Sequence, residues 1–136
     1  MRGATIRDKR DYLRADVVHR LHAADFEKFL SEITAAAFAH PSARLLIYVH
    51  VARASLKIEK FHASRFLDLL AAQARARVAL VATYREVQVV QQYIETLARM
   101  KKANLRSFTK EAAAIAWLLT PVSAAKRPSA RTRKSI

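Results

Sequence analysis

The sequence has 136 residues, of which 52% are hydrophobic, with a formal net charge of +14 and no cysteine. This length fits one globular domain, and the lack of cysteine excludes disulfides, thiolate metal sites and cysteine nucleophiles. No apolar run reaches the length of a membrane span, and the charged first residues lack the apolar centre of a secretory signal. We therefore expect a cytoplasmic protein without a transmembrane segment.

The chain is predicted to begin with a hairpin followed by a helix. Residues Ala4–Arg7 and Tyr12–His19 alternate apolar with charged side chains, which is typical of two strands, and the polar stretch 8–11 is suited to the turn. From about Ala23 to Ala39, apolar residues recur every three or four positions, as on one face of a helix. Pro41 ends this helix because proline cannot donate the helical hydrogen bond.

A buried strand follows, then a helix and a second buried strand. Residues Leu45–Val51 are apolar on both alternating faces, which favours a strand at the centre of the sheet. A polar loop is expected over Ala52–Glu59, and a helix from Ala63 to Ala74. Residues Arg77–Thr83 have the composition of the next buried strand.

The last part of the sequence predicts a long helix, an edge strand and a short helix. In the long helix, Tyr84–Ala103, apolar residues share one face, and three glutamines with Glu95 are expected on the other, at Gln88, Gln91 and Gln92. Residues Leu105–Phe108 are half polar, which suits a sheet edge. Thr109 is expected to cap the final helix.

The order β-β-α-β-α-β-α-β-α predicts a single mixed, mostly parallel α/β sheet flanked by helices. Each strand-helix-strand unit links parallel neighbours, so only the first strand should run antiparallel. We expect one domain over residues 1–120. Residues 121–136 contain five basic residues, no acid and few large apolar residues, and are therefore expected to form a disordered basic tail. The order of the strands in the sheet stays open.

Several segments resemble the STAS and anti-anti-sigma-factor-like fold, over roughly residues 4–119. They read YLRADV, DFEKFLSEI, RLLIYVHV, RVALVAT, REVQVVQQYIETLA and FTKEAAAIAWL. The resemblance implies a non-enzymatic interaction or regulatory domain with a protein partner. Proteins of this type carry a phosphorylatable serine after the central strand, whereas the equivalent stretch 56–60 reads LKIEK here and contains no serine.

A candidate anion or ligand site lies where the predicted parallel strands end. Ligands of open α/β sheets bind beyond the carboxyl ends of the strands, and this rule selects His50, Arg53, Thr83 and Lys110. The alternative is that Thr83 caps a helix while Arg53 and Lys110 are merely solvated.

The sequence contains no recognisable catalytic constellation. The five histidines show no metal-ligand spacing, so no metal and no cofactor is expected. Ser55, His50 and Asp68 make a triad only on paper, because no nucleophile elbow accompanies them. Gly3 is the only glycine, which excludes the glycine-rich phosphate loops. We therefore predict that the protein is not an enzyme.

A second candidate surface lies on the long third helix. Val89, Tyr93 and Met100 cluster beside its apolar face and could contact a protein partner or a second copy of the chain. The alternative is that a neighbouring helix covers them.

Two further functions stay open beside the leading hypothesis of a STAS-like interaction domain. The first is weak, nonspecific nucleic-acid binding at low salt through Arg75, Arg77, Lys101, Lys102 and the tail. The aromatic residues, Trp117 among them, are expected in the core rather than on a base-stacking surface. The second is a small-ligand or lipid carrier with its site at the strand ends.

Overall fold

A computed structural model describes residues 4–19, 23–51, 56–73 and 75–120 of the chain. The predictions made for Arg53 and for residues 121–136 lie outside these ranges. The described elements are β1 (Ala4–Asp8), β2 (Leu13–Val17), α1 (Ala23–Ala39), β3 (Arg44–Val49), α2 (Leu56–Ala71), β4 (Arg77–Ala82), α3 (Arg85–Lys101), β5 (Leu105–Phe108) and α4 (Glu111–Leu118).

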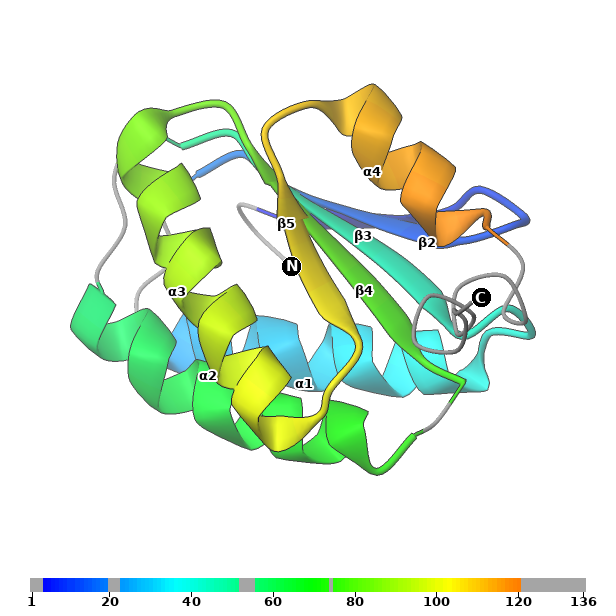
Figure 1. Cartoon of the computed structure of the whole chain (residues 1–136), viewed down its shortest axis with the longest axis horizontal. Helices are drawn as coiled ribbons and strands as arrows, with labels where there is room; N and C mark the ends of the chain where they lie inside the picture. The colour runs from blue at the N-terminus through cyan, green and yellow to red at the C-terminus, as the bar shows by residue number, and fades with distance from the viewer. Residues whose placement is uncertain (1–3, 20–22, 52–55, 74, 121–136) are drawn as a thin grey trace, which may run out of the picture.

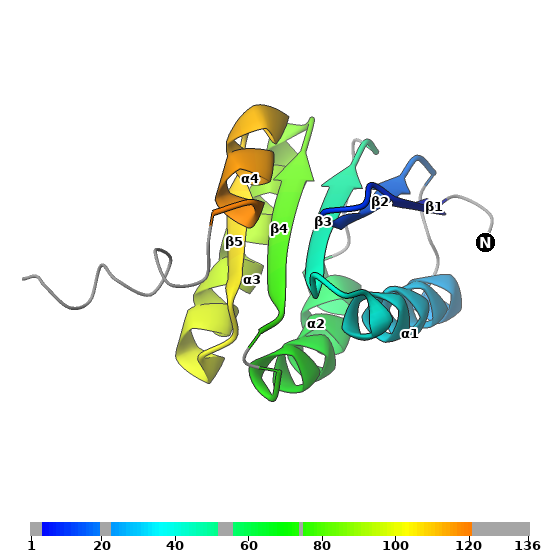
Figure 2. The same ribbon diagram turned by 90° about the vertical axis from the view of Figure 1, so that its right-hand side faces the viewer.

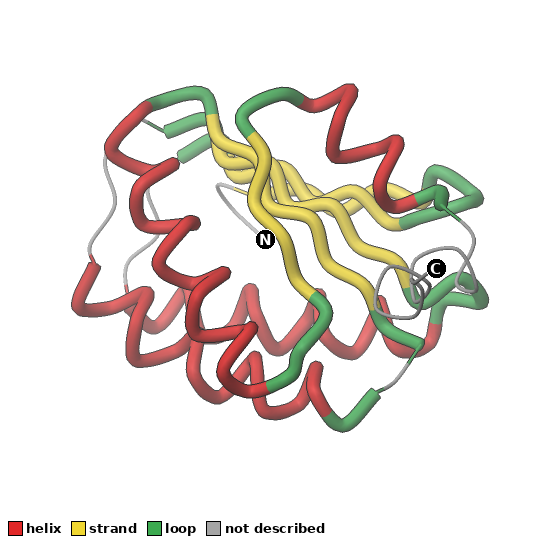
Figure 3. The backbone as a smooth tube through the Cα atoms, in the orientation of Figure 1, coloured by secondary structure: helices red, strands yellow, loops and turns green. Residues whose placement is uncertain are grey.

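The five strands form one sheet in the order β1-β2-β3-β4-β5 (Figure 3). Strand β1 pairs antiparallel with β2, and the remaining neighbours are parallel. This arrangement confirms the predicted mixed, mostly parallel α/β fold. It also supplies the strand order, which local sequence patterns do not contain: every strand lies beside the strand that follows it in the chain.

The helices cover the two faces of the sheet unequally. Helices α1, α2 and α3 lie on one face, and α4 lies alone on the other (Figure 1). Seen from the side, α4 lies in front of β4 and β5, while β1 and β2 lie to one side of it (Figure 2). We call the second face the α4 face.

In the described residues, no helix is both long and apolar enough to span a bilayer.

Two separate cores lie on the two faces of the sheet. The larger core joins the sheet to α1, α2 and α3, and its most deeply buried large side chains are Phe29, Ile33, Leu45, Leu67, Leu70 and Val78. The smaller core, on the α4 face, consists of Tyr12, Leu46, Ala79, Val81, Ala114 and Leu118. Strands β3 and β4 contribute to both cores, which explains why their sequences are apolar at nearly every position.

Several predicted element ends differ from the structure. Helix α2 begins at Leu56, inside the stretch predicted as a loop, since charged residues such as Lys57 and Glu59 are also good helix formers. The residues preceding α3 and α4 are Tyr84 and Lys110, and neither caps its helix through a side-chain hydrogen bond. The prediction that Thr109 caps the last helix is therefore wrong.

Two glutamines predicted on the outward side of α3 instead form hydrogen bonds to β4. Gln91 is buried, and its amide nitrogen donates to the carbonyl oxygen of Val81 at 3.0 Å. Gln88 donates in the same way to Ala82 at 2.9 Å. These side chains satisfy carbonyl groups at the end of β4, so the prediction that they point away from the core is wrong.

Glu95 connects α3 to the edge strand β5. Its carboxylate accepts hydrogen bonds from the hydroxyl and the backbone amide of Ser107, at 2.5 and 3.3 Å. The amide of Leu105 donates to the carbonyl of Ala103 at 3.1 Å. Alternate residues along β5 thus have backbone amides that are bonded within the domain.

Candidate functional site

Each strand contributes one arginine to the α4 face. The arginines are Arg7 on β1, Arg14 on β2, Arg44 on β3, Arg77 on β4 and Arg106 on β5. Their placement follows from the register, because Arg7 pairs with Arg14, Arg44 with Arg77, and Arg106 with a residue of the smaller core. Residues two apart on a strand share a face. Five arginines are therefore gathered on the less covered side of the sheet.

Two of these arginines surround Asp16, whose side chain is buried. One carboxylate oxygen of Asp16, Oδ2, accepts from Arg7 Nη2 at 3.1 Å and from Arg14 Nε at 3.0 Å. The other oxygen lies 2.8 Å from His50 Nε2. Arg14 also donates through Nη1 to the carboxylate of Glu111, in the first turn of α4. We call these five residues the Asp16 cluster.

The positive and negative charges of the Asp16 cluster balance one another. Burial alone would raise the pKa of Asp16, but the hydrogen bonds from Arg14, His50 and Arg7 outweigh it and lower this pKa to about 2. The hydrogen bond to Glu111, joined by those to Asp16, raises the pKa of Arg14 despite its burial. Two guanidinium groups thus face two carboxylates, which is the balance expected of a structural network.

Two of the other three arginines, Arg77 and Arg106, lie beside Trp117 of α4, and Arg44 is the register neighbour of Arg77. The side chain of Arg77 is buried, at 2% exposure, and Nη1 donates to the backbone carbonyls of Trp117, Leu118 and Thr120 at 2.9, 3.2 and 2.7 Å. The guanidinium carbon lies 5.4 Å from the centre of the Trp117 ring. Arg77 therefore neutralises the carbonyl-rich end of α4, where the helix dipole favours a positive charge.

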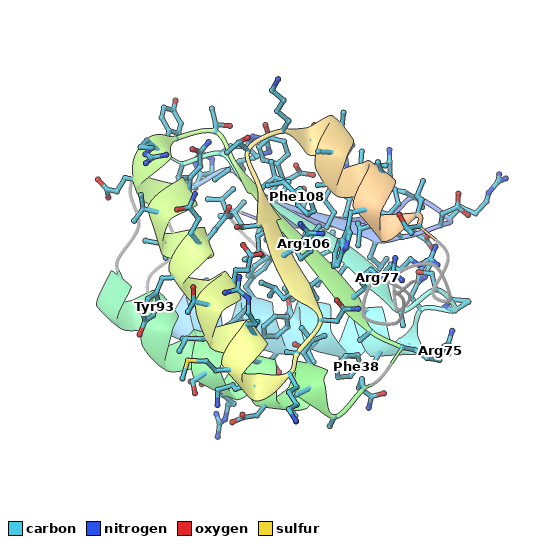
Figure 4. All side chains as sticks on the ribbon, in the orientation of Figure 1. Phe38, Arg75, Arg77, Tyr93, Arg106 and Phe108 are labelled. Carbon is cyan, nitrogen blue, oxygen red and sulfur yellow. The ribbon has the colours of Figure 1, made fainter. Side chains whose placement is uncertain are left out.

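Arg106 covers the same ring from the edge strand. Its guanidinium carbon lies 5.8 Å from the ring centre of Trp117 and 5.5 Å from that of Phe108. The two rings are 5.8 Å apart and inclined at 46°. Figure 4 shows Arg106 and Phe108 along β5, with Arg77 toward α4. Both rings are half-buried while Arg106 is exposed, so the guanidinium rests on an aromatic base at the surface.

Arg44 completes this group beside Arg77 in the sheet register. Burial lowers the pKa of Arg77, and the nearby positive charge of Arg44 lowers it further. Within the described ranges, none of the ion pairs joins Arg44, Arg77 or Arg106 to a carboxylate. We call these three arginines, with Phe108 and Trp117, the Trp117 cluster. Among the described residues, the recorded partners of Arg77 are carbonyl oxygens and the Trp117 ring, and those of Arg106 are two aromatic rings.

One residue of the predicted anion site, His50, already has a carboxylate partner in the Asp16 cluster. His50 follows β3, stacks on Tyr48 with ring centres 4.1 Å apart, and binds Asp16. Thr83 follows β4 and Lys110 precedes α4, and both are exposed. Because Arg53 lies outside the described residues, anion binding by these four residues stays a prediction.

The carboxylate beside His50 was missed by the sequence interpretation. Asp68, the acid considered with His50, lies on α2 and binds Lys101 Nζ at 2.7 Å. The available signal was the alternation in β2, which places Arg14 and Asp16 on one face, two residues apart. A search of the described ranges for three or more metal-ligating side chains in one place finds none.

The candidate interface on α3 is only partly exposed. Val89 is 49% exposed and Met100 is 75% exposed, whereas Tyr93 is half-buried. Contact with a partner through these residues stays a prediction.

A groove of about 360 Å³ lies between α1 and α2, away from the strand ends. It is lined by Glu27, Lys28, Leu30, Arg65, Phe66 and Leu69, among others. This position differs from the strand-end site expected of a small-ligand carrier, and that function stays a prediction.

Comparison with protein-family models, curated proteins and solved structures finds no match to this chain. The resemblance to the STAS and anti-anti-sigma-factor-like fold therefore stays a prediction.

Proposed function

We propose that this chain is a non-catalytic binding domain that docks nucleic acid on the Trp117 cluster. The observation that carries the proposal is the contrast within the α4 face. The Asp16 cluster balances its arginines with carboxylates, whereas Arg44, Arg77 and Arg106 lie together with no carboxylate among their described ion pairs. A polyanion at this point relieves the repulsion between neighbouring guanidinium groups.

The surroundings of the Trp117 cluster add to its positive charge. Arg75, Lys101 and Lys102 lie near the amino-terminal ends of β4 and β5. The carbonyl of Thr120 binds Arg77, and the sequence after it contains five further basic residues within sixteen positions. They are covalently tethered to the Trp117 cluster. A long anion can contact both sets of charges, which favours a nucleic acid over a small anion.

Fluorescence anisotropy with a labelled, mixed-sequence oligonucleotide tests this proposal. The test variant is the double substitution Arg44→Gln and Arg106→Gln, and the matched control is Lys28→Gln with Arg65→Gln on α1 and α2. We expect wild-type binding at low salt, with the logarithm of affinity falling linearly against the logarithm of salt concentration. The double variant should reduce that slope by roughly 1.5, whereas the control should change it much less. Equal effects of the two pairs would contradict a site on the α4 face.

A second candidate function is docking of a protein partner on α3, as the STAS-like resemblance implies. Exposure of Val89 and Met100, which lie on one side of α3 about three turns apart, favours it, since exposed apolar side chains on one surface commonly mark an interface. Affinity capture with wild type and with a Val89→Glu, Met100→Glu variant tests it. A partner that binds wild type and is lost from a stably folded variant supports this function; an equal set of bound proteins contradicts it. A cytoplasmic, regulatory role belongs to the same proposal.

A further inference from the structure

Resting on the proposed function, we infer that the Trp117 cluster prefers single-stranded nucleic acid to duplex. The inference depends on Arg106, the exposed member of the cluster. Charge alone does not distinguish strongly between the two forms of nucleic acid, because both present a phosphate backbone. A flat group fixed at the surface does distinguish them, because bases are open to stacking only in unpaired strands.

Arg106 is held against two aromatic rings. Its guanidinium carbon lies within 6 Å of the centres of both Phe108 and Trp117, so two cation–π contacts fix an otherwise flexible side chain. The rings are anchored in turn, because both pack against the smaller core. An exposed guanidinium ordered in this way loses little further entropy when a base stacks on it.

Arg44 is placed to contact a phosphate of the same nucleic-acid strand as Arg106, whereas Arg77 between them is buried. Arg44 and Arg106 lie on β3 and β5, on either side of Arg77 on β4. Arg44 is opposite Arg77, and Arg106 is opposite Ala79, two residues further along β4. With neighbouring strands about 4.8 Å apart and residues about 3.3 Å apart, the backbones of Arg44 and Arg106 are separated by roughly 12 Å. Arg106 offers a stacking plane and Arg44 offers positive charge, which is the combination used to bind unpaired strands without sequence readout.

The outward backbone amides of β5 are already bonded and are not free to pair with a partner strand. The amide of Ser107 is bonded to Glu95 and that of Leu105 to Ala103. A partner peptide that adds a strand to a sheet needs such edge groups. The side chains on the α4 face, rather than the strand edge, are therefore the surface offered by β5.

Anisotropy titrations with one labelled sequence, presented single-stranded and as duplex, test the inference. The first variant is Arg106→Lys, which keeps the charge and loses the guanidinium plane, and its matched control is Arg85→Lys at the start of α3. We expect wild type to bind the single strand about five- to tenfold more tightly than the duplex at equal salt. Arg106→Lys should abolish this preference and leave duplex affinity and its salt dependence unchanged, whereas Arg85→Lys should retain the preference.

A second variant, Phe108→Leu, tests whether the aromatic ring that contacts Arg106 is needed, while Arg106 itself is unchanged. It removes one ring beneath Arg106 while keeping an apolar side chain, and thermal melting checks that it folds. Reduced preference for the single strand is the expected result. Equal wild-type affinity for both forms, or a preference that survives Arg106→Lys and a folded Phe108→Leu, overturns the inference and leaves the proposed function intact. Binding of a poly-glutamate peptide but of neither nucleic acid overturns both.

Discussion

The Asp16 cluster and the Trp117 cluster lie on one face of the sheet and both contain arginines, but different chemical groups contact these arginines in the two clusters. Arg7 and Arg14 form ion pairs with carboxylates, so their positive charge is balanced within the domain. Arg77 and Arg106 face carbonyl oxygens and aromatic rings, which orient a guanidinium without cancelling its charge. Five arginines on one face therefore need not have one role. Arg7, Arg14 and the buried Arg77 are bonded within the domain, whereas the more accessible Arg44 and Arg106 have no carboxylate among their described ion pairs.

The two clusters also hold opposite ends of α4. Arg14 binds Glu111 in the first turn of the helix, and Arg77 binds the carbonyls at its end. An isolated helix of eight residues is unstable in water, since nucleation is costly and few hydrogen bonds repay it. The position of α4 therefore depends on both clusters, which makes each of them measurable through the stability of the domain.

Substituting Asp16→Asn should have the largest effect on stability. It leaves Arg14, which is 12% exposed, beside a neutral side chain with Glu111 as its remaining described carboxylate, and removing the buried partner of such an ion pair costs about 3 kcal/mol. Urea unfolding followed by circular dichroism measures the loss. Glu111→Gln is the control, because its carboxylate is 40% exposed and an exposed partner contributes less than about 1 kcal/mol. Similar losses for both variants would show that Asp16 is not the centre of its cluster.

Acidification should weaken the Asp16 cluster next. The pKa of Asp16 is about 2 in the folded chain and near 4 when unfolded, so its stabilisation is complete above about pH 4 and is lost as the pH falls toward 2. We expect this contribution to be about 2 kcal/mol. Unfolding free energies of wild type and Asp16→Asn, measured from pH 5 to pH 2, should converge at the acid end. A constant difference would contradict the assignment.

Substituting Arg77→Met should destabilise the domain by about 1 to 2 kcal/mol. Three carbonyls at the end of α4 lose their donor, while removal of a buried charge offsets part of the loss. Trp117 is the only tryptophan, so its fluorescence reports this region directly. We expect a shifted emission maximum and faster hydrogen exchange in α4. Unchanged fluorescence in Arg77→Met would show that the Trp117 cluster does not position the helix.

Substituting Arg44→Gln should have the smallest effect, within about 0.5 kcal/mol of wild type and of stabilising sign. It removes a positive charge beside Arg77 without breaking an ion pair of the described residues. Thermal unfolding measures the change. A clear loss of stability would indicate that Arg44 is structural and would weaken its assignment to a binding surface.

The fold was predictable from local patterns. Apolar residues in β3 and β4 alternate onto two faces, and those of α1 recur with helical spacing, so the element order and the antiparallel first strand follow from the sequence. Strand order was not predictable, because the spacing of apolar residues within one strand carries no information about its neighbours.

The two clusters depend on strand order and could not be assembled from the sequence. Arg44 and Arg77 are 33 positions apart, and only the β3–β4 register makes them neighbours. The same holds for Asp16 and His50, which meet across β2 and β3. Trp117 was expected in the core, since its apolar neighbours in α4 suggest burial. It is half-buried because α4 covers only part of its sheet face.

The hydrogen bonds from Ser107 to Glu95 have a consequence for how copies of this protein behave together. Strand β5 is the outer parallel strand, and an exposed edge of this kind is a template on which another chain can extend the sheet. Because Val78 bonds the carbonyl of Asn104, the amides of Leu105 and Ser107 point away from β4, and both already have acceptors. Glu95 on α3 and the carbonyl of Ala103 thus occupy the outward amides of β5, which disfavours the addition of a second copy of this chain along that edge.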